Sequence, residues 1–116
     1  MFLTKDTTHD KYPIYNHPEM KGVRRRELLT PDNASKNFSL RAYIIEPGGH
    51  TSYDIHSHEH GVYMISGEAV VKVGDKVISL HPSDVIYISS NEPHQFFNHG
   101  EAPVKFLCVR NFTSSP

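Results

Sequence analysis

Short runs of β-branched and aromatic residues, separated by turn residues, make up most of the chain from position 23 onward. In no stretch of twelve residues do apolar side chains recur at helical spacing. The turn Gly74-Asp75-Lys76 is typical of a tight hairpin. This pattern predicts strands over residues 23–29, 38–46, 52–56, 62–65, 69–73, 77–80, 85–88, 95–97 and 104–109.

Roughly eight or nine short strands at regular spacing predict an all-β sandwich or barrel. We expect residues 23–112 to form one domain of ordinary size. Residues 1–22 are polar, contain Pro13 and Pro18, and are read as an irregular N-terminal arm. We expect the aromatic residues of this arm to pack on the body of the domain or on a partner subunit.

Composition narrows the possible functions. Twelve Lys and Arg against thirteen Asp and Glu leave a formal net charge of −1, which gives no electrostatic case for binding nucleic acid or an acidic membrane surface. No apolar run approaches the ~20 residues that span a bilayer, and the polar start of the chain does not predict a signal peptide. The sole cysteine, Cys108, excludes an internal disulfide. We therefore expect a cytoplasmic protein.

Histidines supply the candidate chemistry. Three of the nine, His56, His58 and His60, occupy alternate positions, and His94 follows later in the chain. Residues at i and i+2 of a strand share one face, so we expect these imidazoles to converge, with His94 closing the site. Neutral imidazole is the commonest metal ligand in proteins. The sequence therefore predicts a mononuclear metal centre inside a β-barrel.

The segment from Pro47 to Gly67 resembles the first motif of the cupin superfamily. That motif is a glycine, His-x-His, three or four residues, a Glu that is often Gln or His, and then six residues and a glycine. Counting back from Gly67 places His60 at the Glu position. The motif thus assigns a ligand role to His60.

The segment from Ser83 to Asn98 resembles the second cupin motif, Gly-x5-Pro-x4-His-x3-Asn. His94 and Asn98 match, whereas Ser83 and Ser89 stand where the family has glycine and proline. The family role of the asparagine is structural, in a turn or an outgoing strand. The two motifs together cover roughly half of the chain.

Two ligand sets follow from the resemblance. An alignment without a gap places the His-x-His pair on Asp54 and His56 and gives the set Asp54, His56, His60 and His94. A two-residue deletion in the turn gives His56, His58, His60 and His94 instead. The length of the segment favours Asp54, whereas the chemistry of the first ligand favours histidine. His56, His60 and His94 belong to both sets.

The resemblance implies a double-stranded β-helix, which is a small jelly roll of two packed sheets with the site inside one mouth of the barrel. It also implies one divalent transition metal per chain. Imidazole and carboxylate ligands suit Mn, Fe, Co, Ni, Cu or Zn, and the likeness to small manganese- or iron-binding cupins favours Mn or Fe. Such proteins commonly form homodimers, which we expect here as well.

The function implied is that of a metal-dependent enzyme, dioxygenase-like, acting on a small-molecule substrate. One alternative is a metal-dependent isomerase or lyase acting on a sugar-like substrate. Another is a non-catalytic ligand-binding or sensory cupin, because this barrel also hosts storage and regulatory proteins.

Three residues on the predicted strands could reach the site. An inward-facing Arg41 or Arg110 could hold a substrate carboxylate through two parallel hydrogen bonds, but the pattern favours a solvated face for both. Cys108 is expected to be a small buried core residue. If its thiol faces the pocket, it would lie near the metal.

Overall fold

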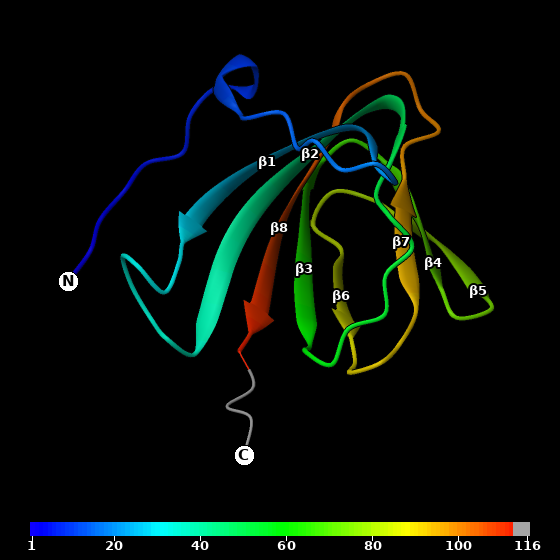
Figure 1. Cartoon of the computed structure of the whole chain (residues 1–116). Coiled ribbons are helices and arrows are strands. Elements are labelled where there is room, and N and C mark those ends of the chain that lie inside the picture. The colour runs from blue at the N-terminus through cyan, green and yellow to red at the C-terminus, as the bar shows by residue number, and fades with distance from the viewer. Residues whose placement is uncertain (113–116) are drawn as a thin grey trace.

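The computed structural model describes residues 1–112, and nearly all regular structure in that part of the chain is β-strand (Figure 1). A single 3-10 turn, η1 (His9–Lys11), precedes the strands. The strands are β1 (Lys21–Leu29), β2 (Phe38–His50), β3 (His60–Ser66), β4 (Ala69–Val73), β5 (Lys76–Leu80), β6 (Val85–Ile88), β7 (His94–Phe97) and β8 (Val104–Asn111). No helix among the described residues is long and apolar enough to cross a bilayer.

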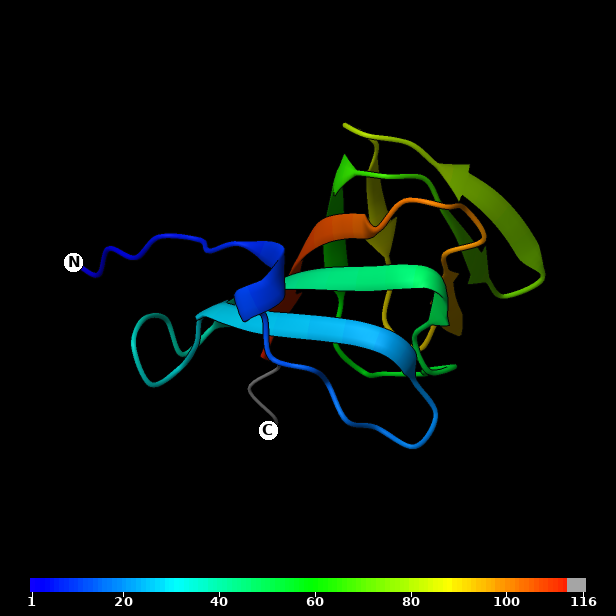
Figure 2. The same ribbon diagram turned by 90° about the horizontal axis from the view of Figure 1, so that it is seen from above.

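All strand pairs are antiparallel and form one continuous sheet in the order β5-β4-β7-β2-β8-β3-β6. β1 pairs with β2 along the edge opposite to the one that pairs with β8. The sheet curls, so that β7, β4 and β5 face the layer that contains β8, β3 and β6 (Figures 1 and 2). The prediction of an all-β fold is therefore confirmed.

β2 joins the two layers and is longer than the sequence predicted. We expected it to end before Pro47, but it continues to His50, which pairs with Phe97 of β7. Gly48 has a φ of 79°, a conformation that glycine adopts at little cost, and its N–H donates to the carbonyl of Asn98. The strand can therefore bend at the Pro-Gly-Gly segment without ending.

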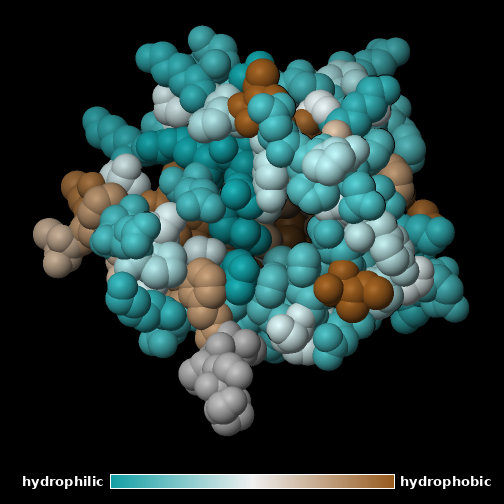
Figure 3. Space-filling model, in the orientation of Figure 1, coloured by the Kyte–Doolittle hydropathy of each residue, from teal (hydrophilic) through white to brown (hydrophobic). Residues whose placement is uncertain are grey.

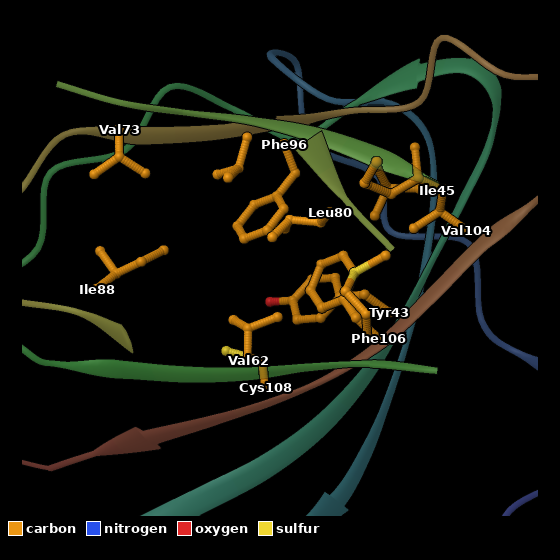
Figure 4. Close-up of a cluster of buried hydrophobic side chains, with 14 residues drawn as sticks. Tyr43, Ile45, Val62, Val73, Leu80, Ile88, Phe96, Val104, Phe106 and Cys108 are labelled. Atoms are coloured by element: carbon orange, nitrogen blue, oxygen red, sulfur yellow. The ribbon is translucent and has the colours of Figure 1, made fainter. Parts of the chain in front are cut away.

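The core lies between the two layers of the curled sheet (Figure 4). Three aromatic rings stack in series: Tyr43 on Phe106 with centroids 5.1 Å apart, and Phe106 on Phe96 with centroids 4.9 Å apart. Burial of each large apolar side chain contributes roughly 1.5–3 kcal/mol to stability. The remaining members of this cluster are aliphatic or sulfur-containing: Val23, Ile45, Val62, Met64, Ala69, Val71, Val73, Leu80, Ile88, Val104 and Cys108.

The N-terminal arm packs on the outer face of its own domain. Tyr12 is buried against Ala42 and Ile44 of β2, and its hydroxyl donates to Asp6. Asp6 also accepts a 2.7 Å hydrogen bond from Nζ of Lys105 on β8. The arm therefore covers the face of β2 that points away from the core. The opposite face of β2, which carries Tyr43 and Ile45, packs in the core.

Candidate metal centre

The histidine-rich segment is not the strand that the sequence predicted over residues 52–56. It is a loop held to β7 by one isolated bridge, in which Asp54 and His94 exchange backbone hydrogen bonds of 2.9 and 3.0 Å. His56 and His58 lie in this loop, and His60 is the first residue of β3. The imidazoles therefore do not converge through alternation on one strand. They converge because the loop lies against the start of β7.

Three imidazoles meet at this point. One ring nitrogen from each of His56, His60 and His94 lies within 4.8 Å of the corresponding nitrogens of the other two. His60 and His94 are 7% and 6% exposed, and His56 is half-buried. Their ring centroids are 5.0 to 5.6 Å apart. These residues are the three that belong to both predicted ligand sets.

Hydrogen bonds indicate which nitrogen of two of these rings is available. Nδ1 of His94 lies 2.9 Å from the carbonyl oxygen of Glu92, and only an N–H can bond to a carbonyl, so Nε2 carries the lone pair. Nδ1 of His60 lies 3.4 Å from Sγ of Cys108. Nε2 of His60 is buried and has no hydrogen-bond partner among residues 1–112. Buried polar atoms are rarely left unpaired, so this nitrogen fits a metal ligand.

The surroundings favour the neutral form of three of the imidazoles, those of His56, His58 and His60. Burial, and then the neighbouring imidazole of His94, lower the pKa of His60 to about 3. Burial, and then the positive charge of Arg110, lower the pKa of His58 to about 4. Burial also lowers the pKa of His56. Neutral imidazole is the form that binds a metal ion, so His60 is in its binding form well below pH 7.

Asp54 and His58 lie beside the three-histidine set. The carboxylate of Asp54 accepts hydrogen bonds of 2.8 and 2.9 Å from the hydroxyl of Ser52, and one of its oxygens lies 3.7 Å from Nε2 of His56. The ring of His58 stacks on His56 at 4.4 Å and meets the edge of His60 at 4.6 Å. Neither donor belongs to the mutually close set. The choice between them as a fourth ligand stays a prediction.

A cavity of about 250 Å³ adjoins the histidines, and Figure 3 shows a hollow in the face drawn, hydrophilic at its edge and hydrophobic in its depth. Aromatic side chains line part of the cavity: Tyr15, Tyr43, Phe96 and Phe106. Polar and charged side chains line the remainder, among them Arg25, Arg41, Asp54, Cys108 and Arg110. The volume lies just below the usual range of roughly 300–1,000 Å³ for small-molecule sites, which limits the occupant to a small molecule.

The prediction of a solvated face for Arg41 is wrong. Its side chain lines the cavity, and the residue is 8% exposed. Because the arm covers the outer face of β2 through Ala42 and Ile44, the alternate positions Arg41 and Tyr43 point inward. Arg110, which is half-buried, also lines the cavity. Cys108 is buried, as expected, and its thiol lies beside both Arg41 and His60.

The remaining motif positions shape the backbone. Asn98 is fully buried, donates from Nδ2 to the carbonyls of Ile45 and Ala102, and accepts from the N–H of Gly100. These three bonds support the structural role that the resemblance implied. Ser83, at the family's glycine position, has a φ of 75°. Glycine favours this left-handed conformation, and the serine adopts it here at a conformational cost.

The family model described as a cupin domain matches residues 42–110, which is more than half of the chain. This chain belongs to the cupin family. The match includes all of β3 and β7 and most of β2 and β8, which carry or support the histidine site. The jelly-roll cupin barrel predicted from the two motifs is thereby confirmed.

Two curated relatives are named as enzymes. The 1-methylthio-D-xylulose 5-phosphate methylsulfurylase of Rhodospirillum rubrum is 35% identical over 78% of this chain and 57% of the relative. The (S)-ureidoglycine aminohydrolase of Arabidopsis thaliana is 22% identical over 92% of this chain and 36% of the relative. This chain therefore spans only about a third to somewhat over half of the length of these two relatives.

A solved structure supports the fold. The polyketide cyclase RemF of Streptomyces resistomycificus superposes with a TM-score of 0.83 and 24% identity, covering 98% of this chain and 83% of the cyclase. At this level of identity the likeness concerns the fold alone.

Proposed function

We propose that this cupin is a metal-dependent enzyme that holds one divalent transition metal between His56, His60 and His94 and acts on a small molecule in the adjoining cavity. The observation that carries the proposal is the buried, partnerless Nε2 of His60 beside the donors of the other two rings. An unpaired buried nitrogen costs stability, roughly 1–3 kcal/mol, unless a ligand satisfies it. A metal ion would supply that partner.

The protein groups around the three rings suit an open site. Three protein donors leave coordination positions for water or substrate, as catalytic metal sites do. The carbonyl of Glu92 orients the ring of His94 through its Nδ1, and the thiol of Cys108 orients the ring of His60 in the same way. Phe96 and Phe106 wall the cavity with apolar surface, which excludes water and strengthens polar interactions inside.

Two reaction classes fit such a site. When bound, iron or manganese would supply dioxygen chemistry, whereas any of the candidate divalent ions would supply Lewis-acid chemistry. The sequence resemblance favours a dioxygenase. The relative named as an aminohydrolase favours the second class, a reaction without electron exchange. Measuring dioxygen uptake during turnover separates them: uptake in proportion to product supports the oxygenase, and product without uptake supports the Lewis-acid enzyme.

The alternative of a non-catalytic binding module is tested by the openness of the site. We expect the protein loaded with Mn(II) to enhance water-proton relaxation, because water exchanges at the open positions. The His60→Ala variant should show no such site-bound enhancement, and His99→Ala, at an exposed position, should behave as the wild type. Stoichiometric Mn(II) without enhancement would indicate a closed, structural ion and would overturn the proposal of an enzyme.

A further inference from the structure

The cavity holds a buried cation that no protein group among residues 1–112 neutralises. Arg41 is more than nine-tenths buried. Its Nη2 lies 3.5 Å from Sγ of Cys108, which is a weak acceptor, and its Nε has no hydrogen-bond partner in the described part of the chain. Among residues 1–112, no Asp or Glu forms an ion pair with this guanidinium. Burial of an arginine without an anion is costly.

The other charges of the cavity leave this imbalance in place. Arg25 lines the same cavity but is paired with Glu27 at 3.4 Å. Arg110 adds a further positive charge, and burial together with the nearby Arg41 lowers its pKa. Asp54 is the one carboxylate in the lining, and it contacts His56 and Ser52 instead. The cavity therefore has an excess of positive charge next to the histidine site.

We infer that Arg41 binds the carboxylate of a small organic acid and thereby sets the substrate class of the metal site. The planar guanidinium can donate two parallel hydrogen bonds, which match a carboxylate. Arg41 and His60 both contact the sulfur of Cys108, so one small molecule can reach both. The binding of the acid rests on Arg41 alone; its role as a substrate rests on the proposed function.

The residues that line the cavity indicate the size and polarity of the remainder of the acid. The stacked rings of Tyr43, Phe106 and Phe96 all line the cavity and make part of its wall apolar. The cavity of about 250 Å³ accommodates a compact molecule only. The occupant is therefore a small carboxylic acid with an apolar or unsaturated body.

Calorimetric titration tests the assignment. The probes are acetate and benzoate, their neutral counterparts acetamide and benzamide, and inorganic phosphate, each added to metal-free and to metal-loaded full-length protein. We expect at least one carboxylate to bind the metal-free protein, the matching amide to bind at least about 30-fold more weakly, and Arg41→Gln to weaken the carboxylate by at least about 30-fold. Arg26→Gln, an arginine outside the cavity lining, is the matched control and should bind as the wild type does.

Three outcomes overturn the inference. These are no carboxylate binding to either form of the wild type, equal binding by Arg41→Gln, or phosphate binding more tightly than both carboxylates. The metal content of the same samples separates this inference from the proposed function. A protein that takes up metal but shows no binding dependent on Arg41 overturns the inference alone. A protein that binds carboxylate through Arg41 but takes up no metal overturns the proposed function, and with it the role of the acid as a substrate, but leaves the carboxylate site at Arg41 in place.

Thermal unfolding distinguishes a binding residue from a structural one. In buffer without added carboxylate, we expect Arg41→Met to unfold at a higher temperature than the wild type, because it removes a buried unpaired charge while keeping most of the side-chain volume. Added carboxylate should raise the Tm of the wild type and leave that of Arg41→Met unchanged. A lower Tm for Arg41→Met, with the same response to carboxylate as the wild type, would assign Arg41 to the architecture and overturn the inference.

Discussion

Sγ of Cys108 lies 3.4 Å from Nδ1 of His60, and the same sulfur lies 3.5 Å from Nη2 of Arg41. One buried thiol therefore contacts both a proposed metal ligand and the unpaired cation of the cavity. The contact with Nδ1 leaves Nε2 of His60 as the nitrogen without a partner. The same thiol therefore lies beside the imidazole that would bind the metal and beside the guanidinium that would bind an acid.

Replacing Cys108 should weaken metal binding without removing the site. Groups that orient a ligating imidazole typically contribute roughly 10- to 100-fold to metal affinity. We expect Cys108→Ala to lose affinity in that range, because the ring of His60 loses its partner, and Cys108→Ser to lose less, because a hydroxyl can replace the thiol. Competition with a chelator measures both. Equal affinity in Cys108→Ala and the wild type would show that the sulfur does not orient His60.

The metal-free protein should lose stability as the pH falls through the range in which unfolded histidine takes up a proton. The pKa of His60 is about 3 in the folded chain, against 6.5 for an unperturbed histidine, and that of His58 is about 4. Below pH 6.5 the unfolded chain binds protons that the folded chain does not, so stability is complete above that pH and declines toward pH 3.

The measurement is the Tm of the metal-free protein, in the presence of a chelator, between pH 7.5 and pH 4.5. His60→Gln, which cannot be protonated in either state, should show a smaller fall in Tm than the wild type over this range. His81→Gln, at an exposed position, is the control. Parallel profiles for the wild type and His60→Gln would contradict the low pKa of His60.

The sequence predicted correctly the strands whose ends are set by neighbouring turn residues. The expected runs 69–73 and 85–88 match β4 and β6 at both ends, because each is a compact apolar run between turn residues. β2 was predicted too short because its continuation past Pro47 depends on hydrogen bonding between Gly48 and Asn98, which is distant in the sequence. The strand expected over 52–56 is absent because only Asp54 pairs with a neighbour.

The histidines of the candidate site could be predicted from the sequence, but the side chains that line the cavity beside them could not. The histidine spacing indicated His56, His58, His60 and His94, and the fold brings ring nitrogens of His56, His60 and His94 together. The orientation of Arg41 could not be predicted, because Arg41 through Ile45 are all buried and no alternation marks the inner face. In the folded chain, the arm packs on Ala42 and Ile44, and this leaves Arg41 on the face of β2 that lines the cavity.

Asp54 and His58 offer a direct comparison of the two fourth-ligand hypotheses. Since neither donor joins the mutually close set, we expect both Asp54→Asn and His58→Ala to retain about one metal per chain, with a loss of affinity of the order seen for orienting groups, roughly 10- to 100-fold. Elemental analysis gives the stoichiometry and chelator competition the affinity. Loss of stoichiometric metal in one variant but not in the other would identify that residue as a ligand.

The ion pair between Asp6 and Lys105 should hold the arm to the domain over a wide pH range. Burial would raise the pKa of Asp6, but hydrogen bonds from Lys105 and Tyr12 outweigh this effect and lower the pKa to about 2. Asp6→Asn should therefore increase hydrogen exchange in residues 7–20 and cost no more than about 1 kcal/mol of stability, as is usual for partly exposed pairs. Asp10→Asn, at an exposed position, is the control. Unchanged exchange in Asp6→Asn would show that the apolar contacts of Tyr12 suffice.

The metal content of the untagged protein and of two single-residue variants tests the central claim most directly. We predict about one divalent transition-metal ion per wild-type chain by elemental analysis. His60→Ala and His94→Ala should bind more than about 100-fold more weakly, beyond the cost of losing an orienting group, whereas His99→Ala should retain the ion. A folded wild-type protein that takes up no metal from Mn(II), Fe(II), Co(II), Ni(II), Cu(II) or Zn(II), or a His60→Ala variant that binds as the wild type does, would contradict the account.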